Sequence, residues 1–549
     1  MRVPTTVPFF NVRDIYMIKC NIKTMGKYLK KFGTHTDYES FTQTGDFIKP
    51  NVSLCVQENE VHYNPWTWAE EYLTFVAREN GTFTFTPQNS NVISYSTDDG
   101  ETWTVGNSVS VNNGDKVMWK GTMTPQEYDG IGTFSSTGNF DVQGNVMSLL
   151  YGDNYKGQTD LTGKEYTFYN LFYNNTKVVN AENLSLPATT LVNSCYYCMF
   201  YGCTSLTTVP VLPATTLAQT CYYYMFNGCT SLTTAAPELP ATTLANGCYG
   251  NMFQGCTSLT TAPELPATTL ANSCYGSMFY GCTSLVNAPE LPATTLAGYC
   301  YSNMFNGCTS LATAPELPAT TLAQYCYNNM FYDCTSLTTA PELPATTLAE
   351  HCYDHMLQGC TGLTSAPELP ATTLTSNCYD GIFYGCTSLE EAPELPATTL
   401  ANYCYQNMFR DCTSLTTAPE LPATTLALSC YTAMFRGCTS LTTAPELPAT
   451  TLATTCYSAM FYGCTNLTTA PELPATTLAN KCYQTMFSGC TNLNYIKAMF
   501  TTTPGSNYTS SWVSGVASSG TFVKNSAATW TTTGVNGIPT GWTVQTASA

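Results

Sequence analysis

The sequence has few charged residues, few histidines and no long apolar run. Asp, Glu, Lys and Arg make up 10% of its 549 residues, and it contains four histidines. No run approaches the ~18 consecutive apolar residues that a membrane-spanning helix requires, so we expect no membrane insertion. The first twenty residues lack both an uninterrupted apolar stretch and a small-residue cleavage site, and we expect no ordinary secretion signal.

Basic residues are scarce and unevenly placed. Nineteen Lys and Arg stand against 37 Asp and Glu, which gives a formal net charge of −18. The first fifty residues hold eight basic and four acidic residues, so their net charge is +4 and that of the remainder is −22. Phosphate binding needs clustered cations, and we therefore exclude a nucleic-acid role for the bulk of the chain.

The motifs of common catalytic and metal sites are also missing. We find no nucleophile motif, no Gly-rich phosphate loop and no pair of cysteines with zinc spacing. The densest group of metal-ligand types, in "EHCYDHM", is His351, Cys352, Asp354 and His355, with the two histidines at i and i+4. It occurs in one repeat out of twelve, at positions that vary. We expect no enzyme activity, no metal site and no cofactor.

What the sequence has in abundance is a repeat. "LPATTL" occurs twelve times, with its Pro at positions from 187 to 474. The step is 26 residues every time except one, where an extra Ala makes it 27. A fixed period of this size with leucines in register is typical of a leucine-rich-repeat solenoid.

A single unit, residues 265–290, predicts a helix, a strand and a corner. The helix is expected over "TTLANSCYGSMFYG", with Cys274, Met278, Phe279 and Cys282 on one face and Gly281 as its stop. "TSLVNA" predicts a short strand, and the prolines of "PELP" end it. The fold class is therefore an α/β solenoid of 26-residue strand–corner–helix units.

One such unit cannot fold alone, because ordering 26 residues costs more free energy than its own core returns, so neighbouring units must stack. We place the solenoid at 186–497. Degenerate repeats predict an N-terminal cap at 151–185 and a C-terminal cap at 498–549.

The pattern AxxCYxxMFxGCTSLTTAPELP resembles the BspA-like leucine-rich repeats of gut bacteria and their phages, over residues 166–500. It differs in having 26 residues rather than about 23, and Met-Phe where Ala-Phe is usual. The resemblance implies adhesion and partner binding rather than catalysis.

The cysteines follow the repeat. Twenty-four of the 27 form twelve C-x7-C pairs, from Cys195/Cys203 to Cys482/Cys490. Eight residues along a helix span about 12 Å, too far for a bridge within a pair. Equivalent cysteines of neighbouring coils could form a disulfide or metal ladder, or could be small buried apolar side chains, and we favour the second interpretation.

Variation between repeats is concentrated in five positions: two before "CY", two after it, and one after "MF". Unconstrained exposed positions usually acquire Lys and Glu, but these hold Tyr, Asn, Ser, Gly and Gln, the composition of antibody-like binding loops. We predict that they bind a host cell-surface glycan or protein. The candidate binding residues are Tyr299, Tyr325, Tyr332, Tyr384, Tyr403, Arg410, Arg436 and Tyr462.

The Glu of "PEL" recurs ten times. Either these carboxylates bind cations such as Ca²⁺, or they extend into water and keep the rod soluble, which we favour. The candidate cation ladder comprises Glu264, Glu290, Glu316, Glu342, Glu368, Glu394, Glu420 and Glu446.

The segment before the repeats divides in two. Residues 72–150 alternate apolar and polar residues around "DG" and "NG" turns, which predicts a small β-sandwich. "YSTDDGETW" and "GDKVMWKG" resemble an Ig-like module, with Phe83, Phe85, Tyr95, Trp103, Val117 and Trp119 as expected core or face residues.

The segment 1–71, whose first fifty residues are basic, predicts an anchoring region. Ile15, Ile18, Ile22, Met25, Leu29 and Phe32 step by three and four as in an amphipathic helix, although "DIYMIKCNI" equally fits a strand. "FIKPNVSLCVQENEVHYNP" resembles structural proteins of Bacteroides-infecting phages.

These features favour a virion appendage: a head or tail fibre or decoration, assembled in the host cytoplasm. Residues 1–71 would dock to other virion proteins, and the chain could form a homo-oligomer. The alternatives are a bacterial surface or secreted adhesin, and a passive spacer with no specific ligand.

Overall fold

The computed structural model describes residues 68–233 and 239–547. Apart from Trp68, these residues belong to one unit covering Ala69–Ala549, and the fold is given for that unit alone. Residues 1–67 of the predicted anchoring region 1–71 thus lie outside the described residues. No helix in the described part of the chain has the length and apolarity needed to cross a membrane.

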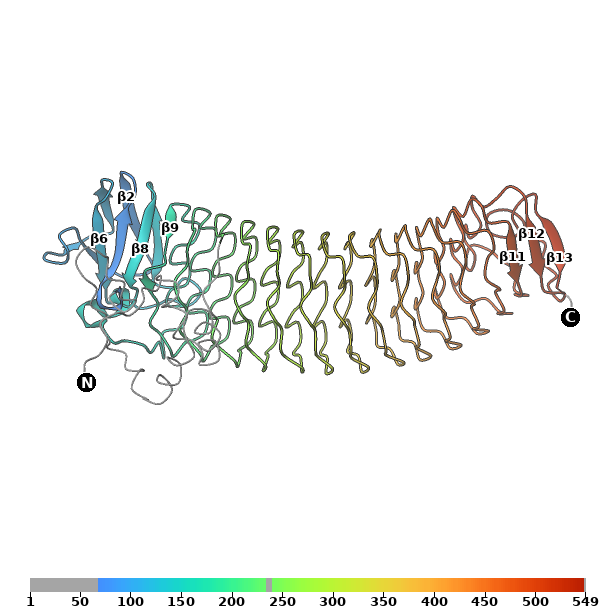
Figure 1. Cartoon of the computed structure of the whole chain (residues 1–549), viewed down its shortest axis with the longest axis horizontal. Helices are drawn as coiled ribbons and strands as arrows, with labels where there is room; N and C mark the ends of the chain where they lie inside the picture. Colours follow the sequence, from blue (N-terminus) through green and yellow to red (C-terminus); the bar gives the residue numbers. More distant parts are fainter. Residues whose placement is uncertain (1–67, 234–238, 548–549) are drawn as a thin grey trace, which may run out of the picture. The chain divides into compact units, whose positions relative to one another are not determined.

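Two β-sheets precede the repeats (Figure 1). A 3-10 turn, η1 (Trp68–Glu70), leads into the strands β1 (Leu73–Ala77), β2 (Gly81–Pro87), β3 (Ile93–Ser96), β4 (Thr104–Val105), β5 (Ser108–Val111), β6 (Lys116–Gly121), β7 (Gly132–Ser136) and β8 (Phe140–Asn145). β5-β2-β7 form the smaller sheet. The larger has the order β10-β8-β1-β6-β3-β4, where β10 is Leu184–Ser185, and β9 (Val178–Asn180) also pairs with β8.

Aromatic side chains fill the space between the two sheets. The Phe75 ring of β1 lies 5.4 Å from Phe83 of β2 and 4.7 Å from Phe134 of β7, measured between centroids. Of the residues expected in this core, Phe83, Phe85, Val117 and Trp119 are buried. Tyr95 and Trp103 are half-buried instead, because they lie toward the edge of the larger sheet, where the Lys120 ammonium covers the Trp103 ring at 4.1 Å. The resemblance to an Ig-like module stays a prediction.

The larger sheet continues into the first coil of the solenoid. After the short helix α4 (Ser148–Tyr151) and the 3-10 turn η2 (Gly152–Asn154), the coil supplies β9 (Val178–Asn180) and β10 (Leu184–Ser185), both parallel to β8. The Phe134 N–H of β7 also donates to the Leu171 carbonyl at 2.8 Å. Both sheets therefore bond to the first coil and cover its end, as Figure 1 shows for β8 and β9.

The expected helix does not form. Residues 272–282 are a series of tight turns whose N–H groups alternate between two kinds of partner. Met278 N–H donates back to the Tyr275 carbonyl at 3.2 Å, within the coil. Tyr275 N–H donates forward to the Cys300 carbonyl at 3.1 Å, and Phe279 N–H to the Met304 carbonyl at 3.0 Å, both in the next coil. We call this arrangement the turn ladder.

The backbone angles explain why a helix is excluded. Ser273, Ser277 and Gly281 have φ of 54°, 53° and 70°, so every fourth residue is left-handed, and the pattern recurs in every coil. An α-helix needs negative φ throughout. The helix prediction followed the spacing of apolar residues, but that spacing fits a period of four better than 3.6: Cys274–Tyr275 and Met278–Phe279 are inward-facing pairs four residues apart.

The rest of each coil is extended and pairs only sparsely. Parallel bridges join equivalent residues at two places, such as Asn287 with Thr313 and Thr295 with Thr321. The core contains the predicted cysteines, Met, Phe and Leu. It also contains the Tyr of "CY", which was not among the expected core residues: Tyr275 is 1% exposed and stacks on Tyr301 with a centroid distance of 5.9 Å.

The last coils close with a small parallel sheet and three tryptophans. The sheet consists of β11 (Tyr495–Ala498), β12 (Thr521–Lys524) and β13 (Thr543–Thr546). The indole N–H groups of Trp512, Trp530 and Trp542 donate to backbone carbonyls at 2.8–3.1 Å. The Trp512 ring lies 6.1 Å from Phe487 and the Trp530 ring 5.2 Å from Phe500, so these large rings pack against the core of the last coils.

Candidate functional site

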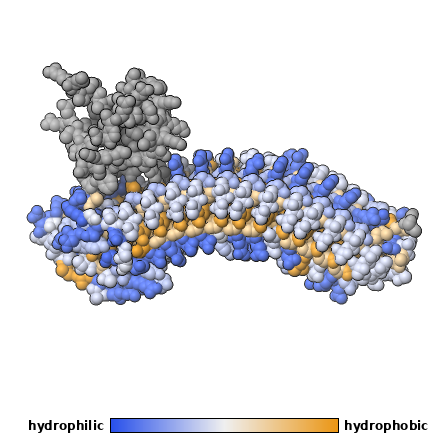
Figure 2. Space-filling model, turned by 90° about the horizontal axis from the view of Figure 1, so that it is seen from below, coloured by the Kyte–Doolittle hydropathy of each residue, from blue (hydrophilic) through white to orange (hydrophobic). Residues whose placement is uncertain are grey.

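The five variable positions of each coil all lie on the turn ladder, between its inward-facing pairs. In the coil that begins this ladder at Asn272 they are Asn272, Ser273, Gly276, Ser277 and Tyr280, and all are half-exposed or exposed. We call the surface that these positions form across the coils the variable face. In the space-filling view of Figure 2, side chains of one kind align along the coils, so that hydrophilic and apolar rows run side by side.

Two of the five positions are constrained by the backbone. The residues before "CY" and before "MF", such as Ser273 and Ser277, are the ones with positive φ. Gly, Asn and Asp adopt this conformation at the lowest cost. Part of the Asn, Gly and Ser content that we assigned to ligand binding therefore has a conformational cause. The other three positions have no such constraint.

Several bulky residues occupy the positive-φ position nevertheless. Tyr299, Tyr325 and His351 have φ of 56°, 56° and 54° in three successive coils. Their rings stack with centroid distances of 4.6 and 4.3 Å. Tyr299, at the start of the stack, is 45% exposed. Tyr403 repeats the conformation, with φ of 59°.

The candidate residues after "MF" form two cation–π pairs. The Arg410 guanidinium lies 4.8 Å from the Tyr384 ring of the preceding coil, and Arg436 lies 4.5 Å from the Tyr462 ring of the following coil. The two arginines are in adjacent coils and turn in opposite directions, as expected for like charges. In an earlier coil, the Tyr332 hydroxyl accepts a hydrogen bond from Gln358 at 3.3 Å.

The structure thus brings six of the eight candidates together in three pairs along one face, while Tyr332 and Tyr403 lie outside these pairs. Tyr299 pairs with Tyr325, Tyr384 with Arg410, and Arg436 with Tyr462. They do not converge on a single pocket. Their role in binding stays a prediction.

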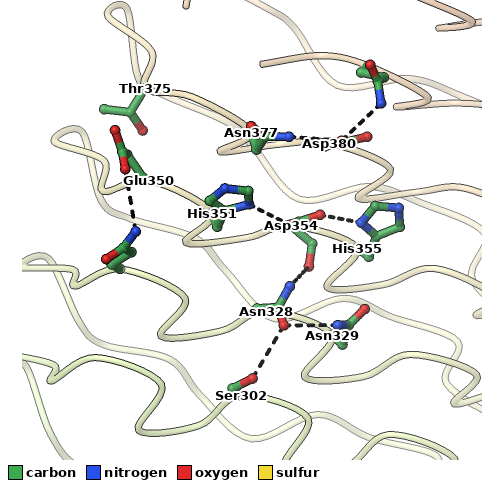
Figure 3. A network of polar contacts seen from close by, with 12 residues as sticks. Ser302, Asn328, Asn329, Glu350, His351, Asp354, His355, Thr375, Asn377 and Asp380 are labelled. Carbon is green, nitrogen blue, oxygen red and sulfur yellow. Dashed lines mark hydrogen bonds and ion pairs between the residues drawn. The ribbon is translucent and has the colours of Figure 1, made fainter. Parts of the chain in front are cut away.

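A polar network crosses the middle of the variable face (Figure 3). Asp354 accepts hydrogen bonds from His351, at 2.8 Å, and from His355, on its two carboxylate oxygens. In the next coil, the Asp380 carboxylate accepts from the side-chain amides of Asn377, Gln406 and Asn407 at 3.2–3.4 Å.

Burial changes the acidity of this network. Asp380 is 5% exposed, and burial raises its pKa to about 6. The pKa of His355 is also raised: burial lowers it, but the hydrogen bond and charge of Asp354 together outweigh that effect. Both groups therefore hold their protons more tightly than they would in water.

The His351–His355 segment does not form a metal site. Asp354 lies between the two imidazoles and binds both, and Cys352 points into the core. Within 68–233 and 239–547, no three His, Cys, Asp or Glu side chains are grouped so that they could hold a metal ion.

The eight candidate cation-ladder glutamates, Glu264 to Glu446, are all exposed and each coil contributes one. Glu342 and Glu368 line a shallow hollow of about 330 Å³ together with Thr, Ser, Ala and Pro side chains. Cation binding by these glutamates stays a prediction.

The cysteines are packing residues, as predicted. All 25 cysteines of the described residues are free and buried. The thiol of the second cysteine in each C-x7-C pair donates to a backbone carbonyl of the preceding coil, for example Cys308 to Phe279 at 3.1 Å. No disulfide or metal ladder joins them in the described part of the chain.

Sequence reasoning missed a group of tyrosines in the first coils. Tyr169, Tyr173, Tyr197, Tyr201 and Tyr224 line one hollow with Cys198, Asn170, Asn227 and Gln254. The runs "FYNLFY", "CYYCMFY" and "CYYYMF" were the available signal, because they put Tyr at several variable positions of consecutive coils.

Comparison with known proteins gives the family. No curated protein sequence is significantly similar to this chain. Thirteen chains of solved structures show similarity, among them the following two. One is a leucine-rich cell surface protein from Faecalibacterium prausnitzii A2-165, with TM-score 0.32 and 18% identity over 68% of this chain and 91% of its own. The other is TLR13 in complex with ssRNA13, with TM-score 0.21 and 12% identity over 60% of this chain and 43% of its own.

The family model described as the BspA type leucine-rich repeat region matches residues 165–288, 249–356, 324–449 and 402–510. These overlapping ranges extend without a break from 165 to 510, more than half of the 549 residues. The resemblance noted from the repeat is confirmed: the chain belongs to the BspA-type leucine-rich repeat family.

Proposed function

We propose that this chain is a non-catalytic adhesion protein whose solenoid presents the variable face to a receptor on a cell surface. The observation that carries the proposal is the separation of constant and variable residues. The constant Cys, Tyr, Met, Phe and Leu point inward and hold the coils together. Most of the variable residues are half-exposed or exposed and come from one part of every coil, so their identity can change without loss of the core; Asp380 is a buried exception.

The chemistry of the long variable side chains supports recognition. Stacked tyrosines and tyrosine–arginine pairs are held in place by their neighbours, so binding would immobilise little additional side-chain freedom. Tyr and Arg are also the residue types enriched where binding energy is concentrated. A passive spacer would not require Tyr299, Tyr325 and Tyr403 in a backbone conformation that disfavours large side chains.

The proposal is tested by binding of the full chain to intact gut Bacteroidetes cells and to a glycan array. In one variant Tyr299, Tyr325 and Tyr403 are replaced together by Ala. The matched control replaces Thr294, Thr320 and Thr398, which are exposed residues of "ATT" in the same coils. We expect the tyrosine variant to lose at least tenfold in affinity, and the threonine variant to bind as the parent does. Equal binding by all three proteins would favour a passive rod.

An adhesion protein of this kind fits either of two locations, a phage virion or a bacterial cell surface. The N-terminal resemblance to phage structural proteins favours a virion appendage that docks through residues 1–71, while membership of the BspA-type family fits a bacterial surface protein equally well. Mass spectrometry of purified virions and of cell envelopes distinguishes them. Detection only in envelopes would end the virion hypothesis, and detection only in virions would end the bacterial one.

A further inference from the structure

A hollow of about 490 Å³ lies on the variable face of the first coils, away from the eight candidate residues. We call it the tyrosine hollow. Its walls include Tyr173, Tyr201 and Tyr224, and its polar groups include Asn170, Asn227 and Gln254. These residues come from four successive coils, beginning with the one that bonds to the two sheets.

Two columns of stacked rings form the walls. Tyr169 stacks on Tyr197 with centroids 4.8 Å apart, and Tyr173 on Tyr201 at 4.9 Å. Tyr224 stands nearly perpendicular to both columns, 6.0 Å from Tyr197 and 6.2 Å from Tyr201. A ring whose face is covered by its neighbour offers a ligand its edge and its hydroxyl group, so these walls present mainly hydroxyls and C–H edges.

A glycine makes this arrangement possible. Tyr223 extends the first column, 5.4 Å from Tyr197, and meets Tyr224 edge-on at 4.5 Å. A Cβ atom at Gly250, the equivalent position of the next coil, would lie 2.4 Å from the Tyr223 ring. Only Gly leaves room for that ring, so the last of the four coils is adapted to the tyrosines of the coils before it.

The amides supply neutral hydrogen-bonding groups. Asn227 donates to Gln254 at 3.0 Å, which orients both amides beside the hollow. The side-chain oxygen of Asn170 is buried and has no hydrogen-bond partner among the described residues. A buried acceptor without a partner is costly, so this amide has unused hydrogen-bonding capacity beside the hollow.

Charge and backbone bonding narrow the class of ligand. No residue lining the hollow is Asp, Glu, Lys or Arg, so an ionic ligand would lose its hydration without gaining an opposite charge. The local backbone is already paired, as in the Asn170 N–H to the Tyr197 carbonyl at 3.1 Å and the Cys198 N–H to the Tyr223 carbonyl at 3.0 Å. It offers no open strand edge to an extended peptide.

We infer that the tyrosine hollow is a binding site for a neutral carbohydrate. Sugar hydroxyls both donate and accept hydrogen bonds, as phenol hydroxyls and carboxamides do, and the C–H groups of a sugar ring pack against aromatic edges. The inference rests on the proposed adhesion function and deepens it, because it names a ligand class and a place on the face.

The test uses the full chain and immobilised neutral gluco-, manno- and galacto-oligosaccharides, each beside a counterpart carrying uronic acid or sulfate. Asn227→Asp adds a charge at nearly constant shape. Its matched control is Asn306→Asp, at the equivalent position three coils later, where the parent Asn306 donates to Asn303. We expect N227D to weaken binding to a neutral oligosaccharide about tenfold and N306D to leave it unchanged.

A second variant, Tyr201→Phe, removes one hydroxyl and keeps the stacked ring. We expect about three- to tenfold weaker binding with an unchanged melting temperature, which separates lost recognition from lost folding. The inference is overturned if no neutral oligosaccharide binds, if charged counterparts bind better, or if N306D weakens binding as much as N227D. If cells are still bound and the Tyr299, Tyr325 and Tyr403 substitutions abolish it, the adhesion proposal survives while this site does not.

Discussion

The cysteine thiols of the repeat are unusually well hidden for so many reactive groups. Each described cysteine is buried, and burial raises the pKa of thiols such as Cys274 and Cys308 to about 12. A thiol must ionise before it attacks a disulfide reagent. Burial thus keeps these side chains both inaccessible and un-ionised at neutral pH.

We therefore predict that the native protein does not react with an aromatic disulfide reagent at pH 8 through its repeat cysteines. The measurement uses a variant in which Cys20 and Cys55, which lie outside the described residues, are replaced by Ser. In buffer, the absorbance of the aromatic thiolate released from the reagent should not increase. In denaturant, it should increase by an amount that corresponds to 25 reacted cysteines per chain. A rapid native phase of several equivalents would show that the columns open or are wrongly placed.

The network around Asp380 predicts an effect of pH on stability. Its folded pKa of about 6 exceeds the unfolded value near 3.8, so the folded state binds the proton more tightly. Stability then falls as the pH rises from about 4 to 6. The raised pKa of His355 acts in the same direction: its contribution is present below the unfolded pKa of 6.5 and is lost as pH rises through the folded pKa.

We expect the urea midpoint of the full chain to be higher at pH 5 than at pH 7.5 for this reason. In Asp380→Asn combined with His355→Gln, the difference between the two pH values should shrink. The control is the double variant Glu264→Gln with Glu290→Gln, which changes two exposed carboxylates. It should leave the difference between the urea midpoints at pH 5 and pH 7.5 unchanged. An unaltered pH dependence in the Asp380 and His355 variant would refute the assignment.

At the scale of the element, the turn ladder replaces a helix because hydrogen bonds between coils are available. Every second N–H of the ladder reaches the next coil, for example Ser277 to Ser302 at 2.8 Å. This requires a left-handed residue at every fourth position, and the third such position in each coil is mostly Gly. Asp333 and Asp411 are the exceptions in the middle coils, with φ of 55° and 58°.

These exceptions constrain the following coil. A Cβ at Gly437 would lie 2.0 Å from an Asp411 carboxylate oxygen, while one at Gly463 would meet nothing closer than 3.9 Å. Both glycines have similar φ, 76° and 74°. An alanine at either position would therefore pay the same cost for its left-handed backbone conformation. Only at Gly437 would its Cβ also clash with the Asp411 side chain.

We predict that Gly463→Ala lowers the free energy of unfolding by about 1 kcal/mol, the cost of a left-handed alanine. Gly437→Ala should cost about 1 kcal/mol more, because the Asp411 side chain must move. The excess should vanish when Asp411→Gly is added, in a double-mutant cycle measured by chemical denaturation. An excess that persists without Asp411 would place its origin elsewhere.

At the scale of the whole molecule, the coils are nearly interchangeable. Each contacts its neighbours through the same columns, with Phe rings about 5.7 Å apart, as between Phe279 and Phe305. In such an array, stability depends on nearest-neighbour interfaces rather than on contacts distant along the chain. Chain length can therefore change by whole coils but not by fractions.

We predict that deletion of residues 256–281, which joins Gly255 to Cys282 in phase, leaves a protein that unfolds in one cooperative transition. Its denaturant m-value should fall with the buried surface that is lost. Deletion of residues 256–268 instead displaces every later core residue by half a coil, and it should expose the following coils to limited proteolysis. Equal protease resistance of the two deletions would contradict the stacked arrangement.

Much of this architecture could be predicted from the repeat. The 26-residue period gave the family and the stacking, and the constant Cys, Met, Phe and Leu gave most of the core. The buried Tyr275 and its equivalents were missed because a 3.6-residue helix cannot face two consecutive residues inward as fully as a turn can. The polar network at Asp380 was missed because Gln406 and Asn407 come from the coil after the one that contains Asp380 and Asn377.

The sequence by itself determined that this protein is a repeat solenoid with a constant core and five variable positions per unit, because each coil must present the same apolar residues to its neighbours. Only the tertiary structure decided how the segment between the cysteines folds. Apolar residues at i, i+4, i+5 and i+8 are compatible with one face of a helix, so the spacing within one unit does not exclude a helix. The hydrogen bonds that distinguish them run between residues about one repeat apart, as from Tyr275 to Cys300, and no single unit contains both partners. The same stacking gathered the tyrosines of successive coils around one hollow, since residues far apart in sequence become adjacent when the coils stack.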